Sequence, residues 1–415
     1  MRADTRGSEI LLVALMFVTW GVVFLDRMAL LYLVPYIAPD LHLNSAQVGA
    51  LAGVISLSWA VSALVFGAVS DRFGRKAVLL PMVVMFSLLS ISSGLVHSFA
   101  QLLAARALLG IAEGPCWSVI MALVEERSDP VHRGRNIGIV VSAAAIIGLA
   151  IAPVLTTQIA AHVGWRWAFY VAGAPGLLMA LLIALLVSDS HEPHGSPAGH
   201  RLSLSDVLSL MRYRNIWVCA LSAAGYMTWL FLINAFGPLY ITMVERQSGT
   251  TAGFLMGAAG LGSFLLGLIG PALSDRYGRR PIWAAQGLLC ILLPLALLIH
   301  PLYNYLWALA TLLFLTQGGQ AITAICVVLV PTESVPRNLA ASAIGFVTLF
   351  GELLGGFAAP IVAGSLAAQH GLATALWMAA GGSAVVLLAS LLASSRGLAT
   401  GQREVGAFGI LYAED

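Results

Sequence analysis

The sequence predicts an all-α integral membrane protein with twelve transmembrane helices arranged in two pseudo-symmetric six-helix bundles. Of its 415 residues, 59% are hydrophobic and 10% are charged, whereas about a quarter of a soluble domain is charged. Apolar runs of about twenty residues, the length that crosses a bilayer, recur along the whole chain. In addition, the segment G-A-V-S-D-R-F-G-R-K at 67–76 returns as G-P-A-L-S-D-R-Y-G-R-R at 270–280.

The internal repeat divides the chain into two halves. Asp71 and Asp275 occupy the same place in the two copies and lie 204 residues apart. Each copy lies between two apolar runs, so we expect a short loop at a membrane face, with a tight turn at its Gly-Arg step. One basic loop alone can be a mere topology signal. Two copies in equivalent positions favour a structural role in both halves.

The apolar runs predict six helices in each half. The first six are expected at about 10–37, 46–69, 77–96, 98–123, 136–160 and 165–187. The second six are expected at about 216–244, 251–274, 281–300, 302–330, 339–368 and 372–394. The predicted organisation is therefore an amino-terminal bundle at 1–187, a central linker at 188–214, a carboxyl-terminal bundle at 215–394 and a tail at 395–415.

The distribution of positive charge predicts the orientation. Of the 21 Lys and Arg residues, 17 lie in the amino terminus, the even-numbered loops or the tail. The positive-inside rule then predicts that both termini, both repeated loops and the linker lie on the cytoplasmic side of a bacterial inner membrane. The first apolar run is too long for a signal peptide and is expected to remain as a helix.

Three further features concern cofactors and folding. The four cysteines each lie alone in an apolar run, so neither a disulfide framework nor a metal cluster is predicted. The linker histidines His191, His194 and His200 resemble a metal tract, but a solvated linker with a short interfacial helix near 202–210 is the favoured interpretation. Prolines recur inside the spans, as in packed transporter helices that kink around a midplane site; they are Pro35, Pro115, Pro153, Pro175, Pro238, Pro294 and Pro360.

Five ionisable residues lie inside predicted spans: Asp26, Arg27, Arg106, Glu113 and Glu352. An ionisable group at the bilayer centre costs at least about 2.5–3.5 kcal/mol, so each one is a functional candidate. Consecutive helical residues point about 100° apart, so Asp26 and Arg27 cannot face one partner. Arg27, with its planar fork, is the candidate anchor for a carboxylate. The alternative is that Arg27 neutralises a buried acid such as Glu113.

The acids are candidates for proton coupling. Arg106 and Glu113 are seven residues apart and therefore share one helical face. A substrate that binds an arginine alters the proton affinity of an acid beside it, which makes Glu113 and Arg106 a plausible coupling set. A static ion pair remains the alternative for Arg106. Glu352, in a glycine-rich stretch, either binds a proton or is a hydrogen-bonded core residue.

Polar and aromatic residues of the second half complete the candidate substrate site. For each of them, interhelical hydrogen bonding or aromatic packing is an alternative explanation. These residues are Tyr226, Trp229, Asn234, Gln317, Gln320 and Thr323.

The doubled G-x-x-x-D-R-x-G-R-[KR] segment, the twelve spans and the linker resemble the major facilitator superfamily over the whole chain, although the second copy has Pro271 in place of Gly67. The resemblance implies that the repeated segments latch the cytoplasmic ends of the halves. The residues concerned are Asp71, Arg72, Arg75, Asp275, Arg276 and Arg279.

Within that superfamily, F-L-D-R-M-A-L, R-A-L-L-G-I-A-E-G-P and G-W-R-W-A-F-Y-V-A-G-A-P-G look like the anion:cation symporters of sugar acids and organic anions. The likeness implies that Asp26 and Glu113 carry protons and that Arg27 binds the carboxylate. Spinster lysolipid transporters share a similar pair and helix 4 motif. Met28-Ala29-Leu30 and Glu352 depart from the symporter pattern, so a larger or more apolar anion also fits.

The function that we expect is proton-coupled import of an organic anion, such as a sugar acid or other carboxylate, by alternating access. The alternative is a spinster-like exporter of lysolipids, amphiphiles or drugs. A sensor would need a larger cytoplasmic domain, and no enzyme motif such as G-x-S-x-G, H-E-x-x-H or a P-loop occurs. We expect no cofactor, no nucleic-acid partner and a monomer in the lipid bilayer, driven by the proton gradient.

Overall fold

The computed structural model describes residues 2–187, 209–336 and 339–394, without the side chains of residues 2–7, 64, 67, 68, 71 and 341. The described chain is helical and contains twelve helices long and apolar enough to cross a membrane. The predicted fold class is therefore confirmed. The interfacial helix near 202–210, the linker histidines and the tail at 395–415 lie largely or wholly outside the described residues.

The first half supplies six spans. They are α1 Arg2–Asp40, α2 Ser45–Phe73, α3 Arg75–Ser93, α4 Phe99–Arg127, a fifth span made of α5 Arg133–Ala143, η1 Ala144–Ile151 and α6 Ala152–Val163, and α7 Trp165–Leu186. Short polar links separate them. At one such link Asn44 caps α2 in a reciprocal capping box with Gln47, which satisfies amide groups at the helix start.

The second half repeats this plan. Its spans are α9 Arg214–Met243, α10 Gly249–Tyr277, α11 Arg279–Leu297, a tenth span made of α12 Leu306–Thr316, α13 Gly319–Ile322, η3 Thr323–Leu329 and α14 Val330–Ser334, an eleventh made of α15 Ala340–Phe350, η5 Gly351–Ala358 and α16 Ala359–His370, and α17 Ala373–Leu392. A 3-10 turn, η2 His300–Asn304, joins α11 to α12.

The repeated charged segments are not the loops that the sequence led us to expect. α2 continues through Arg72 to Phe73, one glycine intervenes, and α3 begins at Arg75. Gly74 and Gly278 have φ values of 97° and 92°, a region that suits glycine because a side chain is strained there. The prediction of a tight Gly-Arg turn was right. The length of the loop was overestimated, because a helix can continue through charged residues beyond the hydrocarbon core.

Three spans depart from regular α-helix at mid-depth. The fifth, tenth and eleventh spans contain the π-helical segments η1, η3 and η5, a local widening that often marks functional sites. Pro153 and Pro360 begin the α-helices that follow η1 and η5. The tenth span is also interrupted at Gln317 and Gly318, between α12 and α13. Two of the seven prolines noted in the sequence therefore lie at these irregularities, and the other five lie inside regular α-helices.

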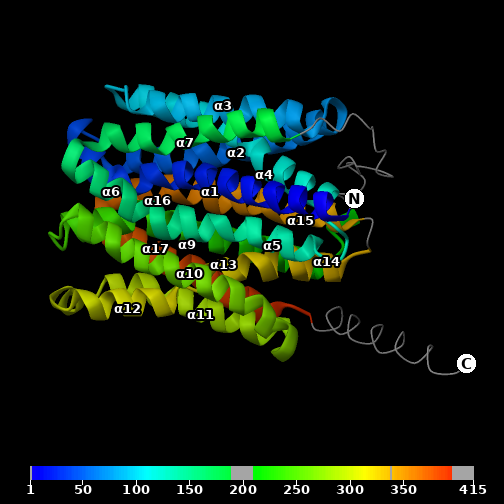
Figure 1. The fold of residues 1–415 in the computed structure, drawn as a ribbon. Coiled ribbons are helices and arrows are strands. Elements are labelled where there is room, and N and C mark those ends of the chain that lie inside the picture. Colours follow the sequence, from blue (N-terminus) through cyan, green and yellow to red (C-terminus); the bar gives the residue numbers. More distant parts are fainter. Residues whose placement is uncertain (1, 188–208, 337–338, 395–415) are drawn as a thin grey trace, which may run out of the picture.

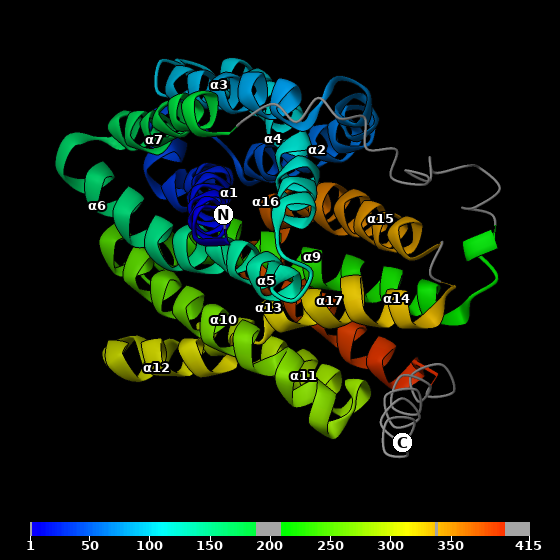
Figure 2. The ribbon, with the colours of Figure 1, turned by 45° about the vertical axis from the view of Figure 1, so that its right-hand side comes forward.

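The two halves lie side by side with their helices roughly parallel (Figure 1). The amino-terminal half, blue to green, forms one side, and the carboxyl-terminal half, green to red, forms the other (Figure 2). α1 begins and α17 ends at the same end of the bundle, which we call the terminal end. The opposite end, where α1 ends and α2 begins, is called the far end.

Glycines bring the halves together toward the far end. A Cβ added to Gly49 of α2 would lie 2.2 Å from the carbonyl oxygen of Pro360, and one added to Gly253 of α10 would lie 2.6 Å from that of Pro153. Gly53 and Gly257 make the next contacts along each helix. The two Gly-x-x-x-Gly pairs are 204 residues apart, as the charged repeats are. Small residues at this spacing let helix backbones approach closely, so the far end is closed by two equivalent seams.

Candidate substrate and proton site

Asp26 and Arg27 point in different directions from the middle of α1, as consecutive helical residues must. Asp26 faces α3 and α4 inside its own half, where it accepts a short hydrogen bond from Ser90. Arg27 faces the other half and contacts η5. Both side chains are buried, at 0% and 5% exposure. The sequence-based expectation that the two residues serve different partners agrees with this geometry.

The amino-terminal half contains a closed cluster of two acids and one arginine. Asp26, Arg106 and Glu113 are each 0% exposed, and Arg106 Nη1 lies 3.9 Å from Asp26 Oδ2. The same nitrogen donates to the backbone oxygen of Asp26 at 3.5 Å, and the guanidinium lies 4.9 Å from the ring centroid of Phe169. Glu113 is close enough to interact electrostatically with both Asp26 and Arg106. We call these three residues the acid cluster.

Hydrogen bonding in the acid cluster is incomplete. Nε and Nη2 of Arg106 have no hydrogen-bond partner among the described residues, and the carboxyl groups of Asp26 and Glu113 lie close enough for a hydrogen bond that requires a proton on one of them. A buried polar group without a partner is costly and rare outside functional sites. The cluster therefore has the capacity to bind a proton or to exchange partners.

Arg27 forms an ion pair between the halves. Its Nη2 donates to Glu352 Oε2 at 2.8 Å and to Ser56 Oγ of α2 at 3.1 Å. Glu352 lies in η5 and is 3% exposed. The alternative from the sequence was that Arg27 neutralises a buried acid, with Glu113 as the example, and the buried acid that Arg27 pairs with is Glu352. Glu352 thus lies at the interface between the halves, beside the proposed anion anchor.

Aromatic side chains surround this ion pair. The guanidinium carbon of Arg27 lies 5.1 Å from the ring of Trp59 and 5.3 Å from that of Phe231. Tyr226 and Trp229 stack with ring centroids 6.1 Å apart, and Tyr226 interacts electrostatically with Glu352. The indole Nε1 atoms of Trp59 and Trp229 and Nε of Arg27 have no partner among the described residues. Trp59 and Phe231 were not predicted from the sequence, since a single aromatic residue in an apolar helix gives no signal.

Three predicted substrate residues of α9 and the tenth span have other surroundings. Asn234 accepts a hydrogen bond from Tyr32 of the other half at 2.8 Å, so it links the halves. Gln317 lies at the break of the tenth span, and its side-chain oxygen accepts from the Gly319 amide at 3.4 Å. Gln320 is partly exposed and packs near Gly267.

Gln317 is also the internal counterpart of Glu113. The dipeptides Glu113-Gly114 and Gln317-Gly318 are 204 residues apart, the same offset as Asp71 and Asp275. One half therefore carries an acid and the other carries an amide at the same place. Thr323, six residues further on, places its buried hydroxyl beside the phenol of Tyr226.

The charged repeats are clamped within their own halves. Arg75 Nε donates to Glu126 at 3.1 Å and its Nη1 donates to Ser70 at 2.8 Å. In the second half, Arg279 makes the same bonds, to Glu333 at 3.1 Å and to Ser274 at 2.7 Å.

Other members of the repeats are less constrained. Asp275 accepts from Arg279 at 2.5 Å, and the exposed Arg72 and Arg276 stack on the rings of Phe73 and Tyr277. The side chain of Asp71 is outside the described part of the structure. Glu126 and Glu333 were missed by sequence reasoning, although acids at the ends of the fourth and tenth spans could have suggested them.

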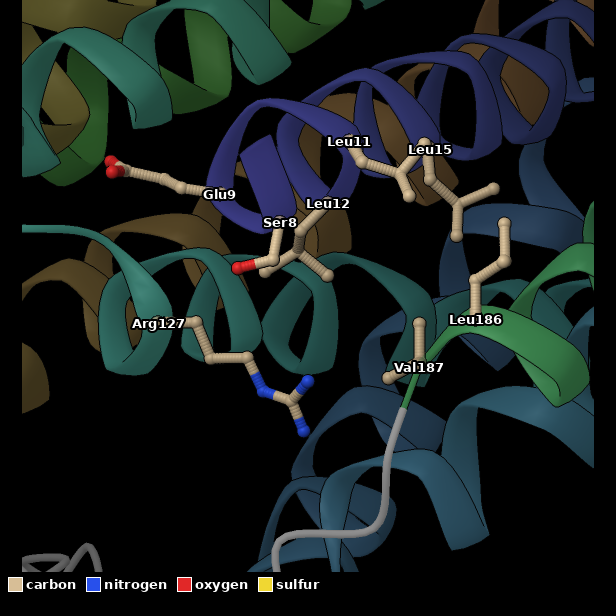
Figure 3. A pocket seen from close by; sticks show the side chains of 8 residues that line it. All are labelled: Ser8, Glu9, Leu11, Leu12, Leu15, Arg127, Leu186 and Val187. Carbon is tan, nitrogen blue, oxygen red and sulfur yellow. The ribbon is translucent and has the colours of Figure 1, made fainter. Parts of the chain in front are cut away.

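A separate cavity of about 180 Å³ lies near the terminal end. Leu11, Leu12 and Leu15 of α1 line it together with Leu186 and Val187, and Arg127 reaches toward it while Glu9 points away (Figure 3). None of the predicted site residues lies there. Groups of three or more metal-binding side chains are absent from the described residues.

Comparison with known proteins finds relatives that are named as transporters. A protein named as a probable 4-methylmuconolactone transporter of Cupriavidus pinatubonensis (strain JMP 134 / LMG 1197) is 29% identical over 86% of this chain and 83% of its own. A cis,cis-muconate transport protein of Acinetobacter baylyi (strain ATCC 33305 / BD413 / ADP1) is 25% identical over 84% and 88%. A probable L-galactonate transporter of Escherichia coli (strain K12) is 29% identical over 63% and 62%.

Solved structures show the same fold. A bacterial homologue of the human lysosomal transporter Spinster, described as inward-facing and unoccupied, matches with a TM-score of 0.74 and 18% identity over 95% of this chain and 98% of its own. The nucleoside transporter NupG matches with a TM-score of 0.75 and 15% identity over 92% and 98%.

The family model described as Major Facilitator Superfamily matches residues 16–360, which confirms the superfamily resemblance seen in the sequence. The family and the names of the relatives point to membrane transport rather than to enzyme catalysis. With twelve spans, two repeated halves and a match over most of its length, the chain belongs to the major facilitator superfamily and is a membrane transporter.

Proposed function

We propose that the protein imports an organic carboxylate together with protons by alternating access. The observation that carries this proposal is the division of labour at the middle of α1. Asp26 belongs to the acid cluster inside one half, and the next residue, Arg27, presents a guanidinium at the interface between the halves. A proton site and an anion site are thereby joined by one peptide bond.

The acid cluster supports the proton part of the proposal through its charge balance. Two carboxyl groups share one guanidinium in a fully buried space, so the cluster is electrically neutral when it holds one proton. Uncompensated charge in such a space is strongly destabilising. Release of that proton toward the less acidic side, and its uptake from the more acidic side, is a means of driving transport.

The interface site supports a carboxylate as the substrate. Arg27 offers a planar, permanently charged fork surrounded by the aromatic rings of Trp59 and Phe231. The predominance of rings over hydroxyl groups favours a flat, unsaturated or aromatic acid over a polyhydroxylated sugar acid. The names of the muconolactone and muconate transporters support the same choice.

The proposed cycle follows from the closed far end. In this proposal the basic loops lie on the cytoplasmic side of the inner membrane. The terminal end is then cytoplasmic, and the present structure is an inward-facing form. Opening the two glycine seams while the terminal ends approach each other would expose the site to the other side. One proton contributes about 1.4 kcal/mol per pH unit, and about 2.3 kcal/mol per 100 mV for each net charge moved.

Proteoliposome uptake tests the proposal. Vesicles containing the full chain, acidic outside, are supplied with cis,cis-muconate, 3-(3-hydroxyphenyl)propionate or galactonate. We expect accumulation that collapses with a protonophore. Glu113→Gln should retain counterflow exchange but lose accumulation driven by pH, because an amide cannot release a proton. Glu245→Gln, which changes a buried glutamate near the far end that contacts His300, is the matched control and should accumulate normally. Unchanged accumulation by Glu113→Gln would defeat the proton assignment.

Export of a lysolipid or another amphiphile is the alternative that we predicted from the sequence. The likeness to the Spinster homologue at 18% identity concerns the fold only. A guanidinium binds the phosphate of a lysolipid as well as a carboxylate, so the preference for a carboxylate rests on the names of the muconolactone and muconate transporters. Extrusion of lysolipid without carboxylate uptake by the same vesicles would reverse this preference.

A further inference from the structure

Glu352 holds the position that a substrate carboxylate would take. In the far-end-closed structure its Oε2 atom accepts a hydrogen bond from Arg27 Nη2 at 2.8 Å, the interaction that a bound organic acid would make with the same guanidinium. The two side chains come from different halves, and both are at least nine-tenths buried. A substrate anion and Glu352 therefore compete for one cation.

Apart from Arg27, few groups around Glu352 can neutralise the charge of its carboxylate. Among the described residues that pack around it, α1 contributes the cation Arg27, α9 contributes the phenol of Tyr226, and α2 contributes the hydroxyl of Ser56. Gly356, one turn along η5, leaves the space in which this carboxylate lies, because a Cβ added there would be only 2.8 Å from Glu352 Oε2. A carboxylate that lost Arg27 here would be a buried charge without a counter-ion, which is strongly unfavourable.

We propose that Glu352 is a built-in competitor for the anion site and that an organic acid binds Arg27 only as Glu352 takes up a proton. In the exchange, the substrate carboxylate and a solvent proton enter, the ion pair between Arg27 and Glu352 breaks, and an ion pair between Arg27 and the substrate forms beside a neutral Glu352. Charge is balanced at every stage. This inference rests on the proposed transport of carboxylates and adds a second proton, separate from that of the acid cluster.

The proposal has a specific consequence for binding. Over the pH range in which Glu352 is ionised in the empty protein, each bound monovalent anion brings one proton with it, so the dissociation constant rises about tenfold per pH unit. With a second proton in the acid cluster, import of a monovalent acid would be electrogenic. Glu352→Gln removes the competing charge but retains an amide oxygen that can accept from Arg27 and Ser56.

Calorimetric titration of the full-length protein in lipid nanodiscs tests this consequence. The probe is 3-(3-hydroxyphenyl)propionate, titrated from pH 6 to pH 8.5 in buffers of different ionisation enthalpy, which report the protons taken up on binding. The wild type should take up about one proton more per anion than Glu352→Gln. Glu352→Gln should bind with little pH dependence and, at high pH, at least tenfold more tightly than the wild type. Glu245→Gln should behave as the wild type.

The outcomes separate this inference from the proposed function. If the wild type binds the probe and Glu352→Gln shows the same proton uptake and the same pH slope, the competitor role is wrong while carboxylate transport stands. Loss of binding in Glu352→Gln, with an unchanged melting temperature, also overturns it, because Glu352 would then support the site rather than compete for it. If the wild type binds neither this probe nor muconate nor galactonate at any pH, the proposed function fails and the inference fails with it. Glu352→Met, which lacks a charge and a hydrogen-bonding oxygen, should also lose the pH slope.

Discussion

Replacing Gly253 by alanine should bias the transporter against its far-end-closed form. The new Cβ atom would lie 2.0 Å from Thr157 Oγ1 and 2.6 Å from the carbonyl oxygen of Pro153. The hydroxyl can rotate away, but the backbone carbonyl cannot move without its helix. Overpacking of this kind costs about 1–3 kcal/mol. Since the contact joins the two halves, the cost falls only on the closed form.

That cost changes the conformational equilibrium about 5- to 150-fold. Alanine also favours a helix over glycine by up to about 1 kcal/mol, but α10 is helical in both forms, so this gain cancels. Adding Gly49→Ala at the equivalent seam, where the Cβ position lies 2.2 Å from the oxygen of Pro360, should roughly double the shift in free energy.

Distance measurement between spin labels provides the assay. Labels at Val163 and Tyr305, exposed residues near the far end of the two halves, should show a longer distance population in Gly253→Ala. Gly138→Ala is the control, because no atom lies within 4 Å of its Cβ position. Identical distance distributions in wild type and Gly253→Ala, or an equal change in the control, would refute the reasoning.

Three further predictions follow from the site and the repeats. Arg27→Lys should raise the KM for carboxylate uptake about 10- to 100-fold, because a lysine keeps the charge but loses the fork and the ring contacts, an effect of about 1.5–3 kcal/mol. An unchanged KM would show that Arg27 does not anchor the anion. Trp229→Phe retains the ring but loses the unpartnered indole N–H, and should raise KM about 2- to 12-fold if that group donates to substrate. Glu333→Gln, which weakens the partly exposed clamp on Arg279, should cost less than about 1 kcal/mol of stability while changing the turnover rate; a large drop in melting temperature would instead assign the clamp to folding.

Much of the fold was predictable because membrane helices are constrained by length and composition. Twelve apolar runs and a repeat separated by 204 residues lead directly to two six-helix halves. The ends of the helices were less predictable, since α2 carries charged residues through to Phe73. Hydropathy reports where the hydrocarbon core ends, and a helix can continue into the aqueous interface.

The candidate site was predictable where burial of charge is costly. Asp26, Arg27 and Glu113 were evident from the sequence because ionisable groups inside spans are rare. Their partners were not. The ion pair of Arg27 with Glu352 joins residues 325 positions apart, and periodicity carries no information about contacts between different helices. For the same reason Trp59 was indistinguishable from an ordinary packing residue.

The glycine seams were present in the sequence as two Gly-x-x-x-Gly pairs at the same offset as the charged repeats. They were missed because glycine is common in membrane helices, with 42 glycines in this chain. The offset, rather than the motif, would have revealed them.

The exchange of Glu113 for Gln317 at equivalent places gives the two bundles different electrical properties despite their similar backbones. A glutamine has no proton to give or take, so at this pair of positions only the amino-terminal bundle can change its charge. Under the proposed mechanism the membrane voltage acts on a different acid in each bundle, Glu113 in one and Glu352 of η5 in the other. A double exchange, Glu113→Gln with Gln317→Glu, would move this carboxyl group to the opposite bundle and reveal whether its location or only its presence matters.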